Sequence, residues 1–352
     1  MPQAGMELLS PRAVLGEFLA PLEAENGLSW LNRIAMGPMD ATSELGGVYP
    51  FLGHVPTLKP TVGPPKLETL NVKSIVIANS PFDVALGIRD EERRHDQTGQ
   101  LMVRVAEFGE AQSVHWLELV SPILAATESL ESFTGSAFHA SNHVWGKSGT
   151  QSNLLVLSAA TDFPDDIVVT DPENPPIQAV SFALRAAAKV IRNLKSDQGK
   201  YMNMMRHSFT ALCSSRSYDY VDSAISLPIL GGGELNLLAS QSSRSHKFTP
   251  ELNPYLDASF DGAGEFNFIL FADDAPRKSL ILQGERLQGG RADGFAPNPN
   301  IATAEAGGVR VSVLGDGTEF FVLNKQMGLF ADSSRGVGLG DPFVSCKVRI
   351  TA

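Results

Sequence analysis

Cysteine is scarce in this sequence, with only Cys213 and Cys346 in 352 residues. Two cysteines cannot build the disulfide framework of a small secreted domain or a structural zinc site, so a reducing compartment is the default expectation. The chain has no run approaching the roughly 18 uncharged apolar residues that a membrane-spanning helix needs. Residues 1–12 lack the basic and apolar regions of a signal peptide. These absences argue against membrane-spanning and disulfide-rich classes, and we expect a soluble cytoplasmic protein.

Positive charge is also in deficit, with 28 Lys and Arg against 39 Asp and Glu and a net charge of −11. A dedicated DNA-binding protein carries a basic face, so this balance argues against one and favours solubility at high concentration. With 32 glycines and 22 prolines, the chain is neither collagenous nor disordered. Its hydrophobic content of 43% is enough for a real core, and 352 residues predict two domains or one elongated domain.

No motif of a known catalytic type is present. The chain contains no Gly-x-Ser-x-Gly elbow, dinucleotide-binding glycine triplet or EF-hand loop. Gly146-Lys147-Ser148 ends like a phosphate-binding loop, but Ser141 stands where that motif needs its first glycine. Cys213 and Cys346 fall in apolar strand-like segments and are interpreted as small core residues. We therefore predict no cofactor and no enzymatic activity.

One alternative, enzymatic hypothesis uses two histidines. His139 and His143 are four residues apart, as metal-binding histidines on a helix can be, and Asp96 or Glu92 would complete a metal-dependent hydrolase. Residues 132–149 are rich in Ser, Gly and Asn, which does not favour a helical register. A structural loop is the favoured interpretation, and the metal hydrolase is a remote alternative.

Hydrophobic periodicity predicts one long helix. Apolar residues recur at three-to-four spacing over 98–121, and Pro122 should kink or end the helix, although 123–130 could continue it. Further helices are predicted at 177–194 and 217–224, and strands at 209–213, 266–271, 280–282 and 344–350. The last of these strands alternates apolar and polar residues, which is typical of a half-buried strand.

The first 48 residues predict a helix on a loose arm. Ser10 can cap the helix, Pro11 takes the favoured first position, and Pro21 can kink or shorten it. Its apolar residues, Leu15, Phe18, Leu19 and Leu22, fall on one face. They are too few to form a core of their own, so the arm needs a partner surface, for which another subunit is a candidate.

Residues 66–79 and 82–89 predict a long β-hairpin flap with one apolar face. No helix lies within the segment to cover that face, and a lone two-stranded hairpin is marginal in water. A neighbouring copy of the chain is the simplest candidate to cover the apolar face of the flap. The candidate inter-subunit contacts in the flap are Lys73, Ile75, Ile77, Phe82, Val84, Leu86 and Ile88.

A charged junction follows the flap over 89–96. Both signs of charge are mixed there, and no apolar pocket is indicated that would shift a pKa toward acid–base catalysis. A solvated junction or an inter-subunit salt-bridge patch is the favoured interpretation. The candidate residues are Arg89, Asp90, Glu91, Glu92, Arg93 and Arg94.

The order of these elements, together with short motifs, resembles a known family. The motifs occur in this order: Tyr49-Pro50-Phe51-Leu52-Gly53, Val62-Gly63, the flap and junction at 75–94, the long helix at 99–119, Phe133-Thr134-Gly135, 138–143, Ala187-Ala188, Gly199, Asn203, 209–212, Asn236-Leu237 and Pro250-Glu251-Leu252. Over 49–288 the chain is similar to tailed-phage major capsid proteins of the Hong Kong 97-type fold, and to the Mu-like major head proteins in particular. Thr61-Val62 stands where that family has an aromatic residue, and the arm before Tyr49 has no counterpart that we identify.

The resemblance implies an α+β fold of the Hong Kong 97 type. Its expected parts are an N-terminal arm (1–48), an extended β-hairpin loop (49–96), a peripheral domain with the long spine helix (97–157), an axial α/β domain (158–295) and C-terminal strands returning to the peripheral domain (296–352). It also implies pentamers and hexamers in an icosahedral shell that encloses double-stranded DNA without sequence-specific binding. Portal and scaffolding or decoration proteins would be partners, and the virion capsid, assembled in the host bacterial cytoplasm, would be the location.

Two further points from the resemblance stay open. An encapsulin-like cellular compartment has the same fold and is the alternative shell. Some relatives cross-link flap lysines to an asparagine of a neighbour, for which Lys66 or Lys73 and Asn324 would be the candidates here. No catalytic carboxylate is indicated for that reaction, so covalent cross-linking is the less favoured hypothesis.

Overall fold

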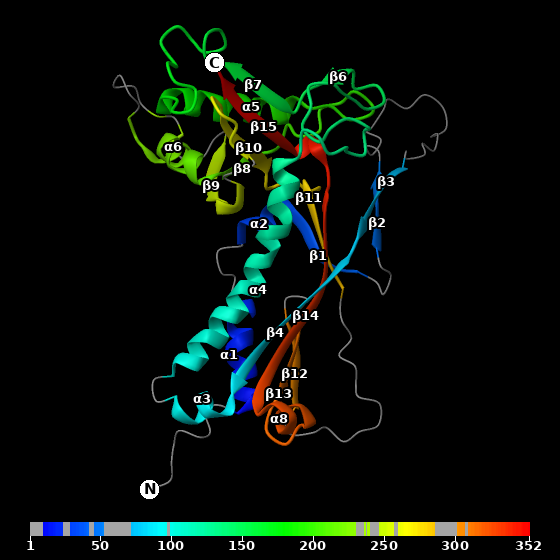
Figure 1. The fold of residues 1–352 in the computed structure, drawn as a ribbon. Coiled ribbons are helices and arrows are strands. Elements are labelled where there is room, and N and C mark those ends of the chain that lie inside the picture. The colour runs from blue at the N-terminus through cyan, green and yellow to red at the C-terminus, as the bar shows by residue number, and fades with distance from the viewer. Residues whose placement is uncertain are drawn as a thin grey trace.

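The computed structural model describes residues 10–23, 29–41, 46–52, 72–96, 99–229, 236, 238–239, 246–256, 260–285, 301–306 and 309–352. The molecule is elongated (Figure 1). A sheet with two helices forms one end, and a long helix and long strands run from it to the other end. The mixture of helices and sheets confirms the α+β class predicted from the sequence.

A five-stranded sheet forms the wider end of the molecule. Its strand order is β7 (Leu154–Ser158), β15 (Ser345–Thr351), β10 (Phe266–Ala272), β8 (Ser208–Cys213) and β9 (Lys247–Leu252). Every residue of β10 is buried. Its continuous apolar sequence, rather than an alternating one, is what a strand covered on both faces requires.

Helices α5 (Ile177–Asn193) and α6 (Ser215–Ser226) pack on one face of this sheet. Phe268 and Leu270 point to that side, whereas Ile269 and Phe271 point to a second core on the opposite face. The second core contains the C-terminal half of the long helix, including Trp116. The structure confirms the strands predicted at 209–213 and 266–271 and the helices predicted at 177–194 and 217–224.

The second large sheet runs along the molecule. It contains β1 (Ala35–Ala41), β11 (Leu280–Glu285), β14 (Gln326–Leu339), β13 (Val309–Leu314), β12 (Ile301–Ala306) and β4 (Ser80–Arg89). The strand β14 is the centre of this sheet, since β4, β11 and β13 all pair with it in antiparallel fashion. This sheet therefore joins segments from both ends of the sequence.

The spine helix α4 (Gln100–Ala125) confirms the long helix that periodicity predicts. At about 1.5 Å per residue its 26 residues extend about 39 Å. The helix passes Pro122 and ends three residues later, so the proline lies in the last turn. Its N-terminal half packs on the long sheet through Val105, and its C-terminal half packs on the five-stranded sheet through Val120 and Leu124.

The N-terminal arm packs on its own chain. Helix α1 (Pro11–Glu23) lies against α4, β12 and β13, with Val14 and Phe18 completely buried. Helix α2 (Ser29–Ile34) leads into β1, which pairs in parallel with β11. The expectation that the arm needs a foreign surface is therefore wrong for these residues, because α4 and the long sheet cover the apolar face.

The predicted hairpin between 66–79 and 82–89 is also wrong in its pairing. Strand β3 (Val72–Ala78) pairs with β2 (Gly46–Leu52) in a separate two-stranded ribbon. Strand β4 pairs along its whole length with β14, about 240 positions later in the chain. The sharp break at Ser80-Pro81 sends the chain into another sheet and does not fold it back. Residues 53–71, with Lys66, lie outside the described residues.

The C-terminal strand departs from expectation in two ways. β15 lies in the five-stranded sheet, between β7 and β10, and not with the strands that return to the spine. It was also expected to be half-buried, yet Lys347 on its polar side is only 3% exposed. The end of α4 and the short helix η1 (Pro254–Leu256) belong to the core that covers this second face.

Candidate functional site

The β2–β3 ribbon stands beside the body of the molecule (Figure 1). Val48 and Val76 are directly opposite one another across its two strands. Both side chains are on the outward face, 62% and 68% exposed. An exposed cross-strand pair of β-branched apolar residues is unusual on a monomer, whose strands normally alternate apolar residues inward and polar residues outward. This pair is the most distinctive outward feature of the predicted flap.

The opposite face of the ribbon contacts the chain's own body. Ile75 packs against a small core around Trp145 and Phe343, and Ile77 is buried where β3 crosses β14. The crossing is close: a Cβ on Gly338 would lie 2.3 Å from Ile77 Cδ1. Glycine at this position is therefore what permits the approach of the two strands.

A buried glutamine holds the base of the ribbon. Gln283 on β11 is completely buried. Its Oε1 accepts a hydrogen bond from the Tyr49 hydroxyl at 2.7 Å, and its Nε2 donates to Asn79 Oδ1 at 2.7 Å. One side chain thus ties both the first ribbon strand and the turn after the second to the long sheet.

The remaining predicted flap residues lie on β4, in the long sheet. Ile88 is buried against α1, α4 and β14, and Leu86 packs partly on the same cluster. Phe82 stacks edge-to-face on His115 of α4, with ring centroids 4.5 Å apart. Val84 stays exposed beside a groove of about 300 Å³ between β4 and α4. Of the seven flap candidates, Lys73 and Val84 are thus the exposed ones.

The charged junction forms the short helix α3 (Asp90–His95) and is held mainly by contacts within the chain. Asp90 is buried and pairs with Arg93 at 2.9 Å and with Arg94. Burial would raise the pKa of Asp90, but hydrogen bonds from the two arginines outweigh it and hold the pKa below its ordinary value. Arg93 also pairs with Asp316 at 2.8 Å. The junction therefore closes the distal end of the long sheet.

The other three junction candidates, Arg89, Glu91 and Glu92, are exposed. Asn324, the cross-linking candidate, is the last residue of helix α8 (Glu319–Asn324). Its side-chain amide donates to Phe320 O at 3.0 Å.

His139 and His143 are structural residues of the loop after the spine helix. Both are buried. His139 Nε2 lies 3.1 Å from Ser345 Oγ, and His143 Nε2 lies 3.0 Å from Asn153 Oδ1. Burial is the main cause that lowers both pKa values, so both imidazoles are neutral at pH 7. Within the described ranges, no three His, Cys, Asp or Glu side chains are grouped to hold a metal, and the hydrolase alternative gains no support.

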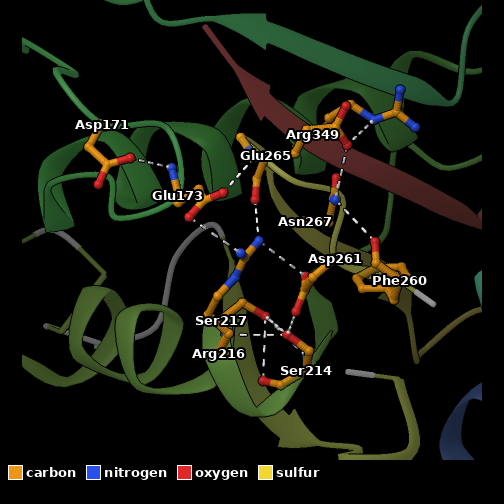
Figure 2. Close-up of polar contacts among 11 residues, drawn as sticks. Asp171, Glu173, Ser214, Arg216, Ser217, Phe260, Asp261, Glu265, Asn267 and Arg349 are labelled. Carbon is orange, nitrogen blue, oxygen red and sulfur yellow. Dashed lines mark hydrogen bonds and ion pairs between the residues drawn. The ribbon is translucent and has the colours of Figure 1, made fainter. Parts of the chain in front are cut away.

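A dense polar network joins the start of α6 to β10 and β15 (Figure 2). The Ser214 hydroxyl donates to Asp261, and Arg216 lies 3.8 Å from the other oxygen of that carboxylate. Ser214 and Ser217 are completely buried, and together they cap α6. A buried serine whose hydroxyl donates to a carboxylate, without a histidine between them, has the geometry of a structural network and not of an activated nucleophile.

A second network fixes the end of the spine to the five-stranded sheet. Lys347 Nζ lies 2.7 Å from Glu128 Oε1 and 4.7 Å from the ring centroid of Phe260. Arg349 pairs with the same carboxylate and, at 3.3 Å, with Glu265. Burial would raise the pKa of Glu128, but Lys347 and Arg349 outweigh it and lower the pKa. This cluster was not predicted from the sequence, because nothing local marks Lys347 as buried.

A buried cation lies where β14 crosses the spine. Arg335 is 2% exposed, with its guanidinium 4.6 Å above the Trp116 ring. Its Nη1 donates to Gln112 O at 2.9 Å and to His115 Nδ1 at 3.0 Å. Burial lowers the pKa of Arg335 to about 10, and no carboxylate pairs with it in the described part of the chain.

We expect Arg335→Met to change the free energy of unfolding by less than about 1 kcal/mol, or to stabilise the protein. The desolvation cost of an unpaired buried charge is removed, while most of the packing volume remains. Arg335→Ala is the control and should cost about 2–3 kcal/mol through the cavity it leaves. Urea unfolding of both variants measures this. A loss of more than about 2 kcal/mol in Arg335→Met would show that the charge itself stabilises the crossing.

Both cysteines are core residues. Cys213 and Cys346 are completely buried and free. Burial raises the pKa of the Cys213 thiol and raises that of Cys346 to about 12. Neither is a thiolate nucleophile at neutral pH. No helix in the described part of the chain is both long and apolar enough to cross a bilayer.

Comparison with known proteins points to one family. Residues 18–170 match the family of the Mu-like prophage major head subunit gpT. That range contains the second part of α1, from Phe18 on, together with the ribbon, the junction and the spine helix. The match begins within α1, so the prediction that the arm before Tyr49 has no counterpart is wrong from residue 18 onward. No curated protein matches the sequence.

Two solved phage capsid structures have a similar fold. The capsid protein of the cyanophage P-SCSP1u superposes with a TM-score of 0.51 at 10% identity, over 89% of this chain and 85% of that one. The capsid protein of Ralstonia phage GP4 superposes with a TM-score of 0.50 at 12% identity, over 88% and 84%. The chain has the Hong Kong 97-type capsid fold, and with the family match this fold supports a tailed-phage major capsid protein akin to the Mu-like major head subunits.

Proposed function

We propose that the chain assembles into pentamers and hexamers of an icosahedral shell that encloses double-stranded DNA. The observation that carries the proposal is the outward apolar pair of Val48 and Val76 on a two-stranded ribbon. The inner face of the ribbon packs on the chain's own body, and burial of its outward face against a sister molecule would stabilise it further. The exposed candidates, Lys73 on the same ribbon and Val84 on β4 of the long sheet, would be further contacts with neighbouring copies.

The energetics suit assembly by many weak contacts. If each ribbon removes about 200 Å² of apolar surface from water, at about 25 cal/mol per Å², the gain is about 5 kcal/mol before ordering costs. Such a contact is weak enough to break and correct errors. Contacts between unlike surfaces of identical subunits close into rings, which a curved shell requires.

The charge balance is compatible with DNA as cargo. A chain with a net charge of −11 is not expected to bind DNA phosphates tightly, because tight binding by counterion release requires many Lys and Arg contacts. Portal and scaffolding or decoration proteins would be partners, and assembly would take place in the host bacterial cytoplasm. The protein would act as a structural subunit without cofactor or catalysis. Nuclease-protected DNA inside purified particles distinguishes this role from that of an encapsulin-like compartment.

We propose that the parts of the subunit have the roles expected from the family resemblance. We assign 1–48 to the arm, 49–96 to the extended loop, 97–157 to the peripheral domain and 158–295 to the axial domain. From 296 on, the chain serves both regions, since β12–β14 join the long sheet and β15 joins the axial sheet. The partly buried ion pairs of Glu128 with Lys347 and Arg349 would make the axial and peripheral parts move together.

Val76→Asp is the direct test of the ribbon's role. We expect the variant to keep the melting temperature of the unassembled subunit and to need at least about tenfold more protein to form shells, because a charge would have to be desolvated in the contact. Negative-stain microscopy and sedimentation measure assembly. Val322→Asp, at a valine of α8 that is 66% exposed, is the matched control and should assemble normally. Shells from Val76→Asp at the wild-type concentration would contradict the proposal.

A further inference from the structure

Helix α5 carries an uncompensated basic stripe. Arg185, Lys189 and Arg192 are spaced at i, i+4 and i+7, which places them along one face of the helix. The 17 residues of α5 include no Asp or Glu. None of the three cations forms an ion pair with a carboxylate of the described residues. In a chain with 39 acidic and 28 basic residues, three neighbouring cations without a counterion are unexpected.

The three cations line a pocket of about 390 Å³, together with Asn193, Met204 and His246. Arg192 is fixed in place, because its Nη2 donates to Met204 O at 2.9 Å and its Nη1 lies 3.1 Å from His246 Nε2. Burial, and then the nearby charges of Arg192 and His207, lower the pKa of His246, so the neutral ring accepts this hydrogen bond. Arg185 and Lys189 are exposed at the pocket. The pocket is therefore suited to an oxyanion.

The same region of the chain supplies the complementary charge. Between residues 158 and 184 there are five acidic residues and no Lys or Arg. Glu173 is turned inward, to Arg216 and the Gly264 amide (Figure 2). Asp165 and Asp166, by contrast, are exposed. We call 162–171 the acidic loop.

The acidic loop does not neutralise the pocket of its own chain. Phe163 packs on Phe182, with ring centroids 5.6 Å apart, which places the loop over the first half of α5. Arg185 lies three residues beyond Phe182 and Arg192 ten residues beyond it, about 4.5 and 15 Å along the helix axis. No ion pair within the described residues joins the loop to the basic stripe. The described residues therefore leave the exposed carboxylates of the acidic loop and the cations of the basic stripe unpaired with one another.

We propose that the basic pocket on α5 receives the acidic loop of a neighbouring copy, with Asp165 and Asp166 as the carboxylates. This inference rests on the proposed assembly into rings, in which one side of each subunit meets a different side of the next. An acidic surface and a basic surface on the same chain are complementary between successive copies of that chain. Such pairs steer association and set the register of the contact. A genome-facing pocket of this charge would instead hold DNA phosphates that must later be released.

The test is a charge reversal and its rescue. Arg185→Glu/Lys189→Glu should require about tenfold more protein to assemble, because two attractive contacts per interface become repulsive. Adding Asp165→Lys/Asp166→Lys should restore assembly to within about threefold of wild type. Sedimentation and negative-stain microscopy give the assembled fraction, and thermal melting of the dissociated subunit verifies the fold. Wild-type assembly should also weaken between about 0.05 and 0.5 M salt, since these pairs are solvent-accessible.

The outcomes separate the hypotheses. If the wild-type protein forms shells and the reversed variant assembles normally, the inference is wrong and the proposed function stands. The same holds if the reversed variant fails to assemble and the added lysines do not rescue it. Normal assembly of the reversed variant with a loss of nuclease-protected DNA also overturns it and assigns the pocket to phosphates. A wild-type protein that forms no rings or shells overturns the proposed function itself, and the inference with it.

Discussion

Gly109→Ala is expected to destabilise the protein by about 2 kcal/mol, the opposite of the usual effect in a helix. Alanine normally favours an α-helix over glycine by about 1 kcal/mol. At Gly109, however, a Cβ would lie 2.3 Å from the backbone carbonyl oxygen of Phe18 in α1. That atom belongs to a helix backbone and cannot rotate away, so α1 must shift from the spine and its buried Phe18 must lose contacts.

Gly16→Ala is the matched control for this prediction. Gly16 lies in α1 itself and is exposed, and a Cβ added there would meet no atom within 4 Å. We expect it to stabilise the protein by about 0.5–1 kcal/mol. Chemical unfolding of both variants measures the difference, and the two effects must have opposite signs. Stabilisation by Gly109→Ala would mean that α1 does not pack on α4 in solution.

Glu128→Ala is expected to cost about 3 kcal/mol. The substitution leaves the Lys347 ammonium group, only 3% exposed, without its carboxylate partner. Arg349 loses the same partner but keeps Glu265. The loss should appear as a lower urea midpoint with an unchanged m value.

Lys347→Met is the control for the Glu128 prediction. It removes the buried charge and keeps most of the side-chain volume above Phe260. Glu128 retains Arg349, so this variant should cost less than about 1 kcal/mol. If Lys347→Met cost as much as Glu128→Ala, the lost stability would come from removing the ion pair and not from leaving the Lys347 charge without a partner.

The same carboxylate predicts a pH dependence. The pKa of Glu128 is lower in the folded chain than its ordinary value, so the folded state binds this proton less tightly than the unfolded state. Its contribution to stability is present above the unfolded pKa of about 4.3 and is lost as the pH falls through the lower folded value. The stability difference between wild type and Glu128→Ala should therefore shrink in acid. An equal difference at pH 7 and at pH 3 would contradict this assignment.

The helices were predictable because their signal is local. The three-to-four spacing over 98–121 marks α4, and a run of apolar residues marks β10. The same rules could not identify strand partners. Strands β3 and β4 are separated by one residue and look like a hairpin, yet β4 pairs with β14. Apolar alternation states that a strand has a buried face but not which strand lies beside it.

In the candidate site, too, the local signal was predictable and the packing partners were not. The flap was recognised as an apolar segment, and Ile75, Ile77 and Ile88 were chosen as contact candidates. The crossing of β3 over Gly336 and Gly338 instead turns the face with Ile75 and Ile77 toward the body and leaves Val48 and Val76 outward. Ile88 is covered by α1, which was expected to belong to a loose arm.

Local pattern was sufficient to predict a long spine helix, an apolar flap and an acidic net charge without catalytic motifs, and the resemblance to a family supplied the capsid fold and role. Long-range packing alone decided that the arm returns to its own spine, that Lys347 is buried and that the outward apolar pair is Val48 with Val76. The physical reason is that periodicity reports how many faces of an element are covered. The element that covers each face is set by contacts between residues hundreds of positions apart.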